Sequence, residues 1–387
     1  MISWPAPLVI AHRGASGYRP EHTLAAYALA ARMGADCIEP DLVATKDEVL
    51  VARHENEISG TTDVADRTEF ATLHTTKTMD GREVEGWFVE DFTWEQLRTL
   101  RARERLPDLR PENTASDGVW GIASFASILA LRANLSAELG REIMVYPELK
   151  HPRHLRTLGL AVEELIVADL SSANLMGAGH AGAERPGSEQ PVMVQCFEHQ
   201  TLIRLRELGM RAPLLQLMPA DHAWSPDQLA RWSAVATGIG PDKRSVIAWT
   251  DDDRLGQSTG LVQAAHAAGL FVHPYTFRAE NVFLPVDLRD GDTASGCGDL
   301  AGEITAYLDA GVDGFFTDQA DAGVSARNAW IKTEGRLQRR TGTPQTWMSA
   351  LKGAPPGTGR PKAPRPTGDG DREGLRRLRR PSQTCRP

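Results

Sequence analysis

Two histidines stand at the ends of segments whose apolar residues otherwise predict buried strands. His12 ends the run Pro7–His12, and His54 ends the run Val49–His54, directly before Glu55. An imidazole titrates near pH ~6.5, so two of them can act as a base and an acid in one reaction. A single histidine at a strand end is more often structural, but the pair suggests proton-transfer chemistry.

Three carboxylates form a second set of candidate residues. Side chains alternate along a strand, so Glu39 and Asp41 in CIEPDLV face one side, and Glu148 and Lys150 in YPELK likewise share a side. Two unit charges ~4 Å apart repel by about 4 kcal/mol at an effective dielectric constant of ~20. If the three acids converge, they must protonate, move apart or hold a cation, and oxygen ligands favour Ca²⁺ or Mg²⁺ over zinc. Spacing alone leaves open that each acid simply pairs with a nearby Arg or Lys.

Arg13 lies between His12 and Gly14. Its planar guanidinium suits phosphate oxygens, and the glycine allows a ligand to approach the backbone closely. The alternative is a structural salt bridge from Arg13 to Glu39 or Asp41.

These residues depend for their positions on a predicted alternation of strands and helices. Short apolar runs predict nine strands, at 7–12, 37–43, 49–54, 143–149, 191–197, 213–218, 234–240, 270–277 and 311–318. Helical patterns cover 24–33, 71–77, 94–104, 153–170, 199–210 and 258–269. The alternation is typical of a parallel sheet in an α/β protein.

The strand count decides the architecture. Leu42 to Glu48 is too short to hold a crossover helix between the second and third strands, so Val49–His54 should form a hairpin with the second. The other eight strands then predict a TIM-type (β/α)₈ barrel within residues 1–340. Residues from about 55 to 121 have no place in the repeat, and we expect an inserted lid over the barrel mouth with short helices of its own.

Composition limits the remaining possibilities. The net charge is −8, yet Leu351–Pro387 holds ten Lys/Arg and three Asp/Glu, so the rest of the chain is strongly acidic. An acidic surface argues against binding to nucleic acid. Residues 341–387 are rich in Pro, Gly and Arg, which predicts disorder. The widely spaced Cys37, Cys196, Cys297 and Cys385 predict reduced thiols. No transmembrane run or signal-peptide pattern is present, so we expect a cytoplasmic protein as the sequence stands, or an exported one if translation starts upstream. The oligomeric state stays open.

Seven segments occur in one order along the chain: HRGASGYRPEHT, IEPDLVATKDEVLVARHE, TTDVADR, PELK, QCFE, HPYTFR and GVDGFFTD. Together they resemble the glycerophosphodiester phosphodiesterase family, and in particular its longer bacterial branch. The resemblance covers about Leu8 to Gly323. It implies the same TIM-type barrel with an inserted lid.

The resemblance also implies roles for individual residues. His12 and His54 would be the general acid–base pair, and Glu39, Asp41 and Glu148 the ligands of one divalent cation, with Ca²⁺ favoured and Mg²⁺ possible. Further positions would bind the substrate and its phosphate: Arg13, Lys150, Phe197, Tyr275 and Arg278.

Several positions leave alternatives. Arg278 could instead pair with Asp318, and Gln195 could line the pocket. His22 could orient the loop that bears Arg13 or hold glycerol hydroxyls. The family commonly has His-Asp where this chain has His54-Glu55, so Glu55 could reach the metal or support it from behind.

The implied substrate is a small glycerophosphodiester, and the products are glycerol-3-phosphate and an alcohol. One histidine would take a proton from a glycerol hydroxyl or from water, and the other would protonate the leaving alcohol. A cyclic phosphate or direct water attack are both compatible with the residues. Two alternatives are a phospholipase D-like or lysophospholipase D activity on the same barrel, and a binding protein that retains glycerophosphodiesters without cleaving them.

Overall fold

The computed structural model describes residues 4–79, 81–176, 191–220 and 222–341. All nine predicted strands are present in it. They are β1 (Leu8–His12), β2 (Cys37–Glu39) with β3 (Asp41–Ala44), β4 (Leu50–Ala52), β7 (Met144–Val145) with β8 (Glu148–Leu149), β9 (Val194–Cys196), β10 (Leu214–Met218), β11 (Gly238–Pro241), β14 (Phe271–Val272) and β15 (Gly314–Thr317). Two of the predicted strands are interrupted, one at Pro40 and one at Tyr146–Pro147, because proline cannot donate to the strand ladder.

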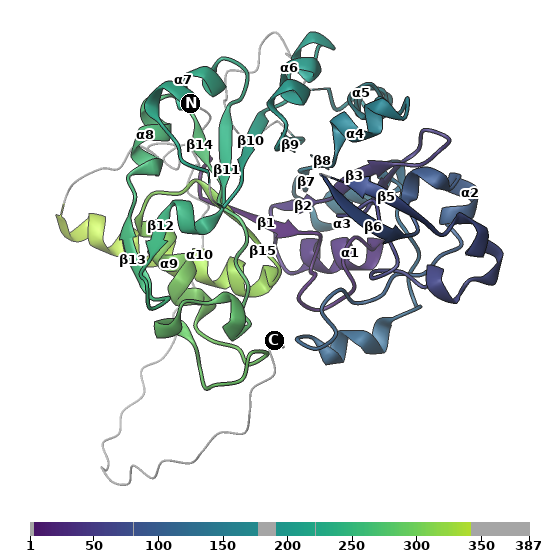
Figure 1. The fold of residues 1–387 in the computed structure, drawn as a ribbon. Coiled ribbons are helices and arrows are strands. Elements are labelled where there is room, and N and C mark those ends of the chain that lie inside the picture. Colours follow the sequence, from purple (N-terminus) through teal and green to yellow (C-terminus); the bar gives the residue numbers. More distant parts are fainter. Residues whose placement is uncertain (1–3, 80, 177–190, 221, 342–387) are drawn as a thin grey trace.

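The strands form two sheets, with the orders β15-β1-β2-β7 and β14-β11-β10-β9-β8-β3-β4. Every pairing within them is parallel except that of β3 with β4, which is the predicted antiparallel hairpin. Figure 1 shows the first strand and the last, β15, side by side although they lie at opposite ends of the described chain. The protein is therefore an α/β protein with parallel sheets, as the alternation predicts.

Backbone hydrogen bonds also connect the two sheets at two places. Beside β7, the Val145 amide donates to Pro191 O at 2.9 Å, and the Met193 amide donates back to Val145 O at 3.1 Å. Between β14 and β15, the Asp313 amide donates to Val272 O at 3.0 Å and the Phe277 amide to Phe316 O at 2.8 Å.

Helices follow most of the strands and cover the sheets from outside. They are α1 (Leu24–Arg32), α3 (Phe125–Leu139), α4 (Pro152–Thr157), α5 (Val162–Ser172), α6 (His199–Glu207), α7 (Pro226–Ser233), α8 (Leu261–Ala267), α9 (Leu300–Asp309) and α10 (Ala320–Thr341). The helical pattern predicted over 153–170 is two helices, since Gly159 between them has φ +84°.

The core has two main layers. The larger apolar cluster joins the helices to the outer faces of the strands, and includes Val9, Ile38 and Tyr27. A smaller cluster consists of strand side chains that point to the other face of the sheets, among them Ile10, Tyr146, Leu215 and Phe316. The alternation of strand side chains thus fills both faces of the sheets.

The segment 55–121 contains little regular structure. It holds the short 3₁₀ helices η1 (Val64–Asp66), η2 (Thr68–Leu73), η3 (Val89–Asp91) and η4 (Pro111–Ser116), the helix α2 (Trp94–Leu97), and the hairpin β5 (Thr75–Met79) with β6 (Arg82–Gly86). The helix predicted over 71–77 is wrong, because the three β-branched threonines of β5 favour a strand and Gly81 turns the chain at φ +78°. A second hairpin, β12 (Ile247–Trp249) with β13 (Leu255–Ser258), was not predicted.

The cysteines differ in their redox state. Cys37 and Cys196 are free and buried, as predicted, but Cys297 takes part in a disulfide, so the prediction of a reduced thiol is wrong there. Spacing identifies only cysteine pairs that are close in sequence, which explains the error. Cys385 and the predicted disordered tail, from residue 342 on, lie outside the described residues. Among the helices that the structure describes, none is both long and apolar enough to cross a membrane.

Gly14 closes the turn after β1 and fixes how the loop that bears Arg13 meets α1. It has φ +86°, and a Cβ atom added there would lie 2.7 Å from the backbone carbon of Ala26. Only glycine meets both demands without strain.

We predict that Gly14→Ala lowers the free energy of unfolding by about 2–4 kcal/mol, because it adds a left-handed backbone penalty to overpacking against α1. Gly209 is a matched control, since it has φ +87° but nothing within 4 Å of an added Cβ. Gly209→Ala should cost only the backbone penalty of about 1–2 kcal/mol. Urea unfolding curves of both variants check this, and equal losses would contradict the role given to the contact with Ala26.

Candidate active site

The register of the parallel strands brings the predicted residues to one edge of the sheets. His12 is level with Glu39 on β2, and Asp41 is level with Glu148 on β8, which is level in turn with Gln195 on β9. The β3–β4 hairpin returns the chain to the same edge, where the Arg53 amide donates to Asp41 O at 2.9 Å and places His54 next in line. The carboxyl ends of parallel strands are where α/β proteins build sites.

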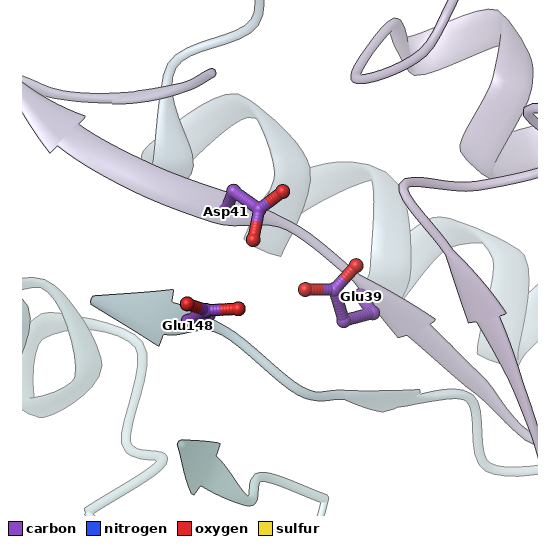
Figure 2. Close-up of side chains that lie close together, drawn as sticks. All are labelled: Glu39, Asp41 and Glu148. Atoms are coloured by element: carbon purple, nitrogen blue, oxygen red, sulfur yellow. The ribbon is translucent and has the colours of Figure 1, made fainter. Parts of the chain in front are cut away.

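Figure 2 shows the side chains of Glu39, Asp41 and Glu148 turned toward a common space. One carboxylate oxygen from each lies within 4.8 Å of the others, and all three residues are buried. Burial, followed by the charges of Asp41 and Glu148, raises the pKa of Glu39 well above its usual range. Burial is also the main reason that the pKa of Glu148 rises to about 8. The cluster is thus short of positive charge.

Two cations of the chain neutralise part of this charge. Lys150 Nζ lies 2.6 Å from Glu148 Oε1 and 3.3 Å from Asp41 Oδ1, and Arg13 Nε lies 3.2 Å from Asp41 Oδ2. Burial would raise the pKa of Asp41, but Lys150 and Arg13 outweigh it and hold that pKa well below its usual value. The sequence left open that each acid simply pairs with a nearby Arg or Lys. Asp41 does so, whereas Glu39 has no Arg or Lys side chain paired with it among the described residues.

Each histidine is held at Nδ1 by a carboxylate. His12 Nδ1 lies 2.7 Å from Asp318 Oδ1, and His54 Nδ1 lies 2.5 Å from Glu55 Oε1. The Nε2 atoms of both rings have no hydrogen-bond partner among the described residues. An ionised carboxylate on Nδ1 fixes the proton there and leaves the Nε2 lone pair for another molecule.

Both imidazoles favour the neutral form in the free protein. Burial, and next the charge of Arg13, lowers the pKa of His12 to about 3. Burial, with Arg13 and Lys150, lowers the pKa of His54 to about 4. Near pH 7 each ring can therefore accept a proton at Nε2.

The two histidines share one cavity of about 400 Å³ with Glu39 and Glu148 of the acid cluster. Its polar lining includes His12, Arg13, Glu39, His54, Glu148 and Lys150, and its aromatic lining includes Phe197, Trp249, Tyr275 and Phe283. Every predicted substrate-binding residue is among the residues that line it, Arg278 included. Phe197 and Tyr275 meet edge to face with ring centres 6.1 Å apart.

Some candidates have partners that limit their freedom. Arg278 Nε donates to Asp318 Oδ2 at 2.9 Å, which is the structural alternative named from sequence. Arg13 Nη1 donates to Glu21 Oε2 at 2.8 Å, and its backbone amide donates to Glu39 Oε2. Gln195 Nε2 donates to Glu39 Oε1 at 3.2 Å.

His22 and Glu55 both act behind the cavity wall. His22 is fully buried between the Tyr27 hydroxyl at 2.8 Å and Asp41 Oδ2 at 2.9 Å, so it orients an acid and does not reach the cavity. Glu55 is not part of the acid cluster and contacts His54 and Arg105.

Sequence reasoning missed several charged residues of this site. Arg105 contacts Glu55 and Glu21, and Arg110 contacts Asp318 and Glu280. Both arginines come from the irregular segment 55–121, where no periodic pattern marks a buried side chain.

The acid cluster fits a hard divalent cation. All three donors are carboxylates, their oxygens are close enough to share one ion, and the raised pKa of Glu39 reflects negative charge that a cation would offset. The described residues offer no histidine or thiolate within this cluster, which favours an oxygen-seeking ion.

Comparison with known proteins gives one consistent result. The model of the glycerophosphoryl diester phosphodiesterase family matches residues 12–322. A glycerophosphodiester phosphodiesterase of Arabidopsis thaliana is 31% identical over 330 residues, which cover 81% of this chain and 83% of the relative. Another, from Haemophilus influenzae, is 28% identical and covers 82% of this chain and 88% of its own.

Among solved structures, an Oleispira antarctica phosphodiesterase in complex with sn-glycerol-3-phosphate has a similar fold. Its TM-score is 0.53 at 18% identity, covering 84% of this chain and 97% of that one. The family match extends from His12 to the start of α10 and so includes every residue that lines the cavity. The chain therefore belongs to the glycerophosphoryl diester phosphodiesterase family.

Proposed function

We propose that this enzyme hydrolyses small glycerophosphodiesters to glycerol-3-phosphate and an alcohol, with one divalent cation on Glu39, Asp41 and Glu148. Ca²⁺ is the favoured ion and Mg²⁺ the second choice. One observation carries the proposal: two histidines with free Nε2 atoms line the same cavity as Glu39 and Glu148, two members of a cluster of three buried acids.

The fold that supports this site is, in our proposal, a closed (β/α)₈ barrel with the segment 55–121 as a lid over its mouth. The backbone bonds between β14 and β15, and between β7 and the start of the β9 segment, support closure. Ion pairs from Arg105 to Glu21, in the loop after β1, and from Arg110 to Asp318, directly after β15, support the position of the lid.

The histidines perform the proton transfers. The Nε2 atom of one imidazole takes the proton of the attacking hydroxyl, which belongs either to the glycerol or to water. The other imidazole, protonated beside the anionic phosphodiester, gives its proton to the oxygen of the leaving alcohol. Asp318 and Glu55 stabilise the imidazolium form at Nδ1, as carboxylates do in other histidine-based sites.

Arg13 and Lys150 bind the phosphate in this scheme. Both line the cavity, and both stay positively charged because neighbouring acids outweigh the effect of burial on their pKa values. When bound, the divalent ion supplies further positive charge at the phosphate oxygens and lowers the pKa of a coordinated hydroxyl.

A lysophospholipase D activity is the second candidate. Phe197 and Val282 line the cavity and are 39% and 47% exposed. Exposed apolar side chains at the rim would suit an acyl chain.

We predict that His12→Ala and His54→Ala each lower turnover of glycerophosphocholine by about 10²–10⁴-fold, because each removes one proton-transfer group. A coupled assay for glycerol-3-phosphate measures the loss, and circular dichroism confirms that the variants fold. His154→Ala is the control, since that histidine does not line this cavity. Near-normal turnover in either active-site variant would remove that residue from the mechanism.

We also predict that chelation abolishes activity and that added Ca²⁺ or Mg²⁺ restores it. Ca²⁺ should raise the melting temperature of the chelated protein, because it binds the folded state alone. Glu148→Gln should reduce this shift, whereas Glu138→Gln, an exposed acid paired with Arg32, should keep it. Full activity in the chelated protein would contradict the metal requirement.

The two candidate substrates give opposite expectations. If the substrate is a small glycerophosphodiester, kcat/KM for glycerophosphocholine should exceed that for lysophosphatidylcholine. The reverse order, with a KM that rises in Phe197→Ala for the lysolipid alone, would assign the lysophospholipase D activity instead.

A further inference from the structure

Two arginines from one short run, RLPDLR, reach the two carboxylates that hold the histidines. Arg105 contacts Glu55, the partner of His54, and Arg110 contacts Asp318, the partner of His12. Both arginines lie in the segment 55–121, far in sequence from His12 and Asp318. The same segment is therefore connected to both imidazoles, each time through one carboxylate.

The contacts at His54 fix a side chain that would otherwise be mobile. The Glu55 side chain is 41% exposed, and its Oε1 atom accepts from His54 Nδ1 at 2.5 Å and from Arg105 Nη1 at 2.9 Å. Arg105 is held on its other side by Glu21, with Nε and Nη2 each 2.7 Å from a carboxylate oxygen. Glu21 is buried and also accepts from Arg13, so Arg105 is anchored to an acid that is itself fixed in position.

The contacts at His12 are more deeply buried. Asp318 Oδ1 faces His12, while Oδ2 accepts from Arg110 Nη2 at 2.6 Å and from Arg278 Nε at 2.9 Å. The other nitrogens of Arg110 donate to Glu280 Oε1 at 2.5 Å and to Ser16 O at 2.9 Å. All three guanidinium nitrogens of Arg110 thus have an acceptor, and only 6% of its side chain is exposed.

A carboxylate shared between an arginine and an imidazole has little freedom left. Charge-assisted hydrogen bonds are about twice as strong as neutral ones, and the planar guanidinium fixes their direction. With one oxygen directed at Nδ1, the imidazole keeps its ring orientation and its Nδ1–H tautomer, as in other carboxylate–histidine pairs. Among the described residues, loss of Arg105 would leave Glu55 held by His54 alone, and loss of Arg110 would leave Asp318 Oδ2 with Arg278 as its one remaining arginine.

We propose that Arg105 and Arg110 are positioning residues for His54 and His12, which they align through Glu55 and Asp318. The segment 55–121 must then be docked for both imidazoles to be aligned at once. This inference rests on the proposed roles of the two histidines. It explains why Glu55, with its longer side chain, can stand where the family commonly has aspartate: Arg105 restrains the additional rotatable bond.

The geometry separates this role from ordinary ion pairing on the surface. Arg98, in the same segment, pairs with Glu95 at 3.3 Å with both side chains more than half exposed. Such a pair contributes little and contacts no other functional group. Arg98 therefore provides a matched control.

The kinetic test uses Arg105→Gln and Arg110→Gln. Misplacement of a reacting group by ~1 Å can cost on the order of 10²-fold, so we expect kcat to fall by about 10- to 100-fold with KM little changed. Arg105→Lys and Arg110→Lys should restore part of kcat, because one charged donor remains. Arg98→Gln should retain full kcat. A rise in KM alone, or a lower melting temperature with normal kcat, would overturn the proposal.

Two further measurements test whether each arginine acts through its histidine. In a double-mutant cycle, Arg105→Gln should cause no additional loss of kcat when His54 is already alanine, and the same should hold for Arg110→Gln with His12→Ala. Additive losses would contradict the proposal. Nitrogen NMR of labelled histidine side chains should show a Nδ1–H tautomer in the parent enzyme and tautomer exchange in the matching arginine variant, and an unchanged spectrum would overturn the proposal.

Failure of this inference is distinguishable from failure of the proposed function. If His12→Ala and His54→Ala retain turnover, the proposed mechanism is wrong whatever the arginine variants do. If those variants are inactive while Arg105→Gln and Arg110→Gln keep normal kcat and normal tautomers, the mechanism stands and only the positioning role is refuted.

Discussion

The structure depends above all on the confinement of negative charge at Glu39, Asp41 and Glu148. Three carboxylates within 4.8 Å of one another repel strongly when buried, and in the part of the chain that the structure describes the Lys and Arg side chains paired with them are Lys150 and Arg13. The raised pKa of Glu39 shows that this compensation is incomplete. A fold that keeps such an arrangement has given up stability at that point, which is common at sites that bind a cation or carry out chemistry.

The surrounding strands and side chains keep the three carboxylates and the two histidines in position. The strand is interrupted at Pro40, so that Glu39 on β2 pairs with β1 while Asp41 on β3 pairs with β8. The hairpin from β3 to β4 returns the chain to the same edge, where His54 lies. Behind these residues lies a set of supporting ion pairs and hydrogen bonds: His22 on Asp41, Asp318 on His12, and Glu55 on His54. Arg105 and Arg110 extend this set into the segment 55–121. The cavity is therefore organised by contacts between parts of the chain that are distant in sequence.

The sequence predicted local features well and long-range contacts poorly. The nine strands and the β3–β4 hairpin follow from residue patterns of period two and from the alternation with helices, whereas the patterns left the convergence of Glu39, Asp41 and Glu148 open. The hairpin β5–β6, the disulfide at Cys297, and the roles of Arg105, Arg110 and Glu21 were missed. Each depends on a partner chosen by the tertiary fold, and an arginine in an irregular segment gives no periodic signal of burial. The family resemblance added the metal and acid–base roles, which spacing alone left open.

The most direct test of the account locates the cation itself. Crystals grown with Mn²⁺, a manganese substitute for the hard divalent ion, and with sn-glycerol-3-phosphate would be measured for anomalous scattering. The account predicts one strong peak within coordination distance, about 2.0–2.6 Å, of carboxylate oxygens from Glu39, Asp41 and Glu148. A phosphate bound beside His12 and His54 with no peak at these acids, in an enzyme active under the same conditions, would contradict it.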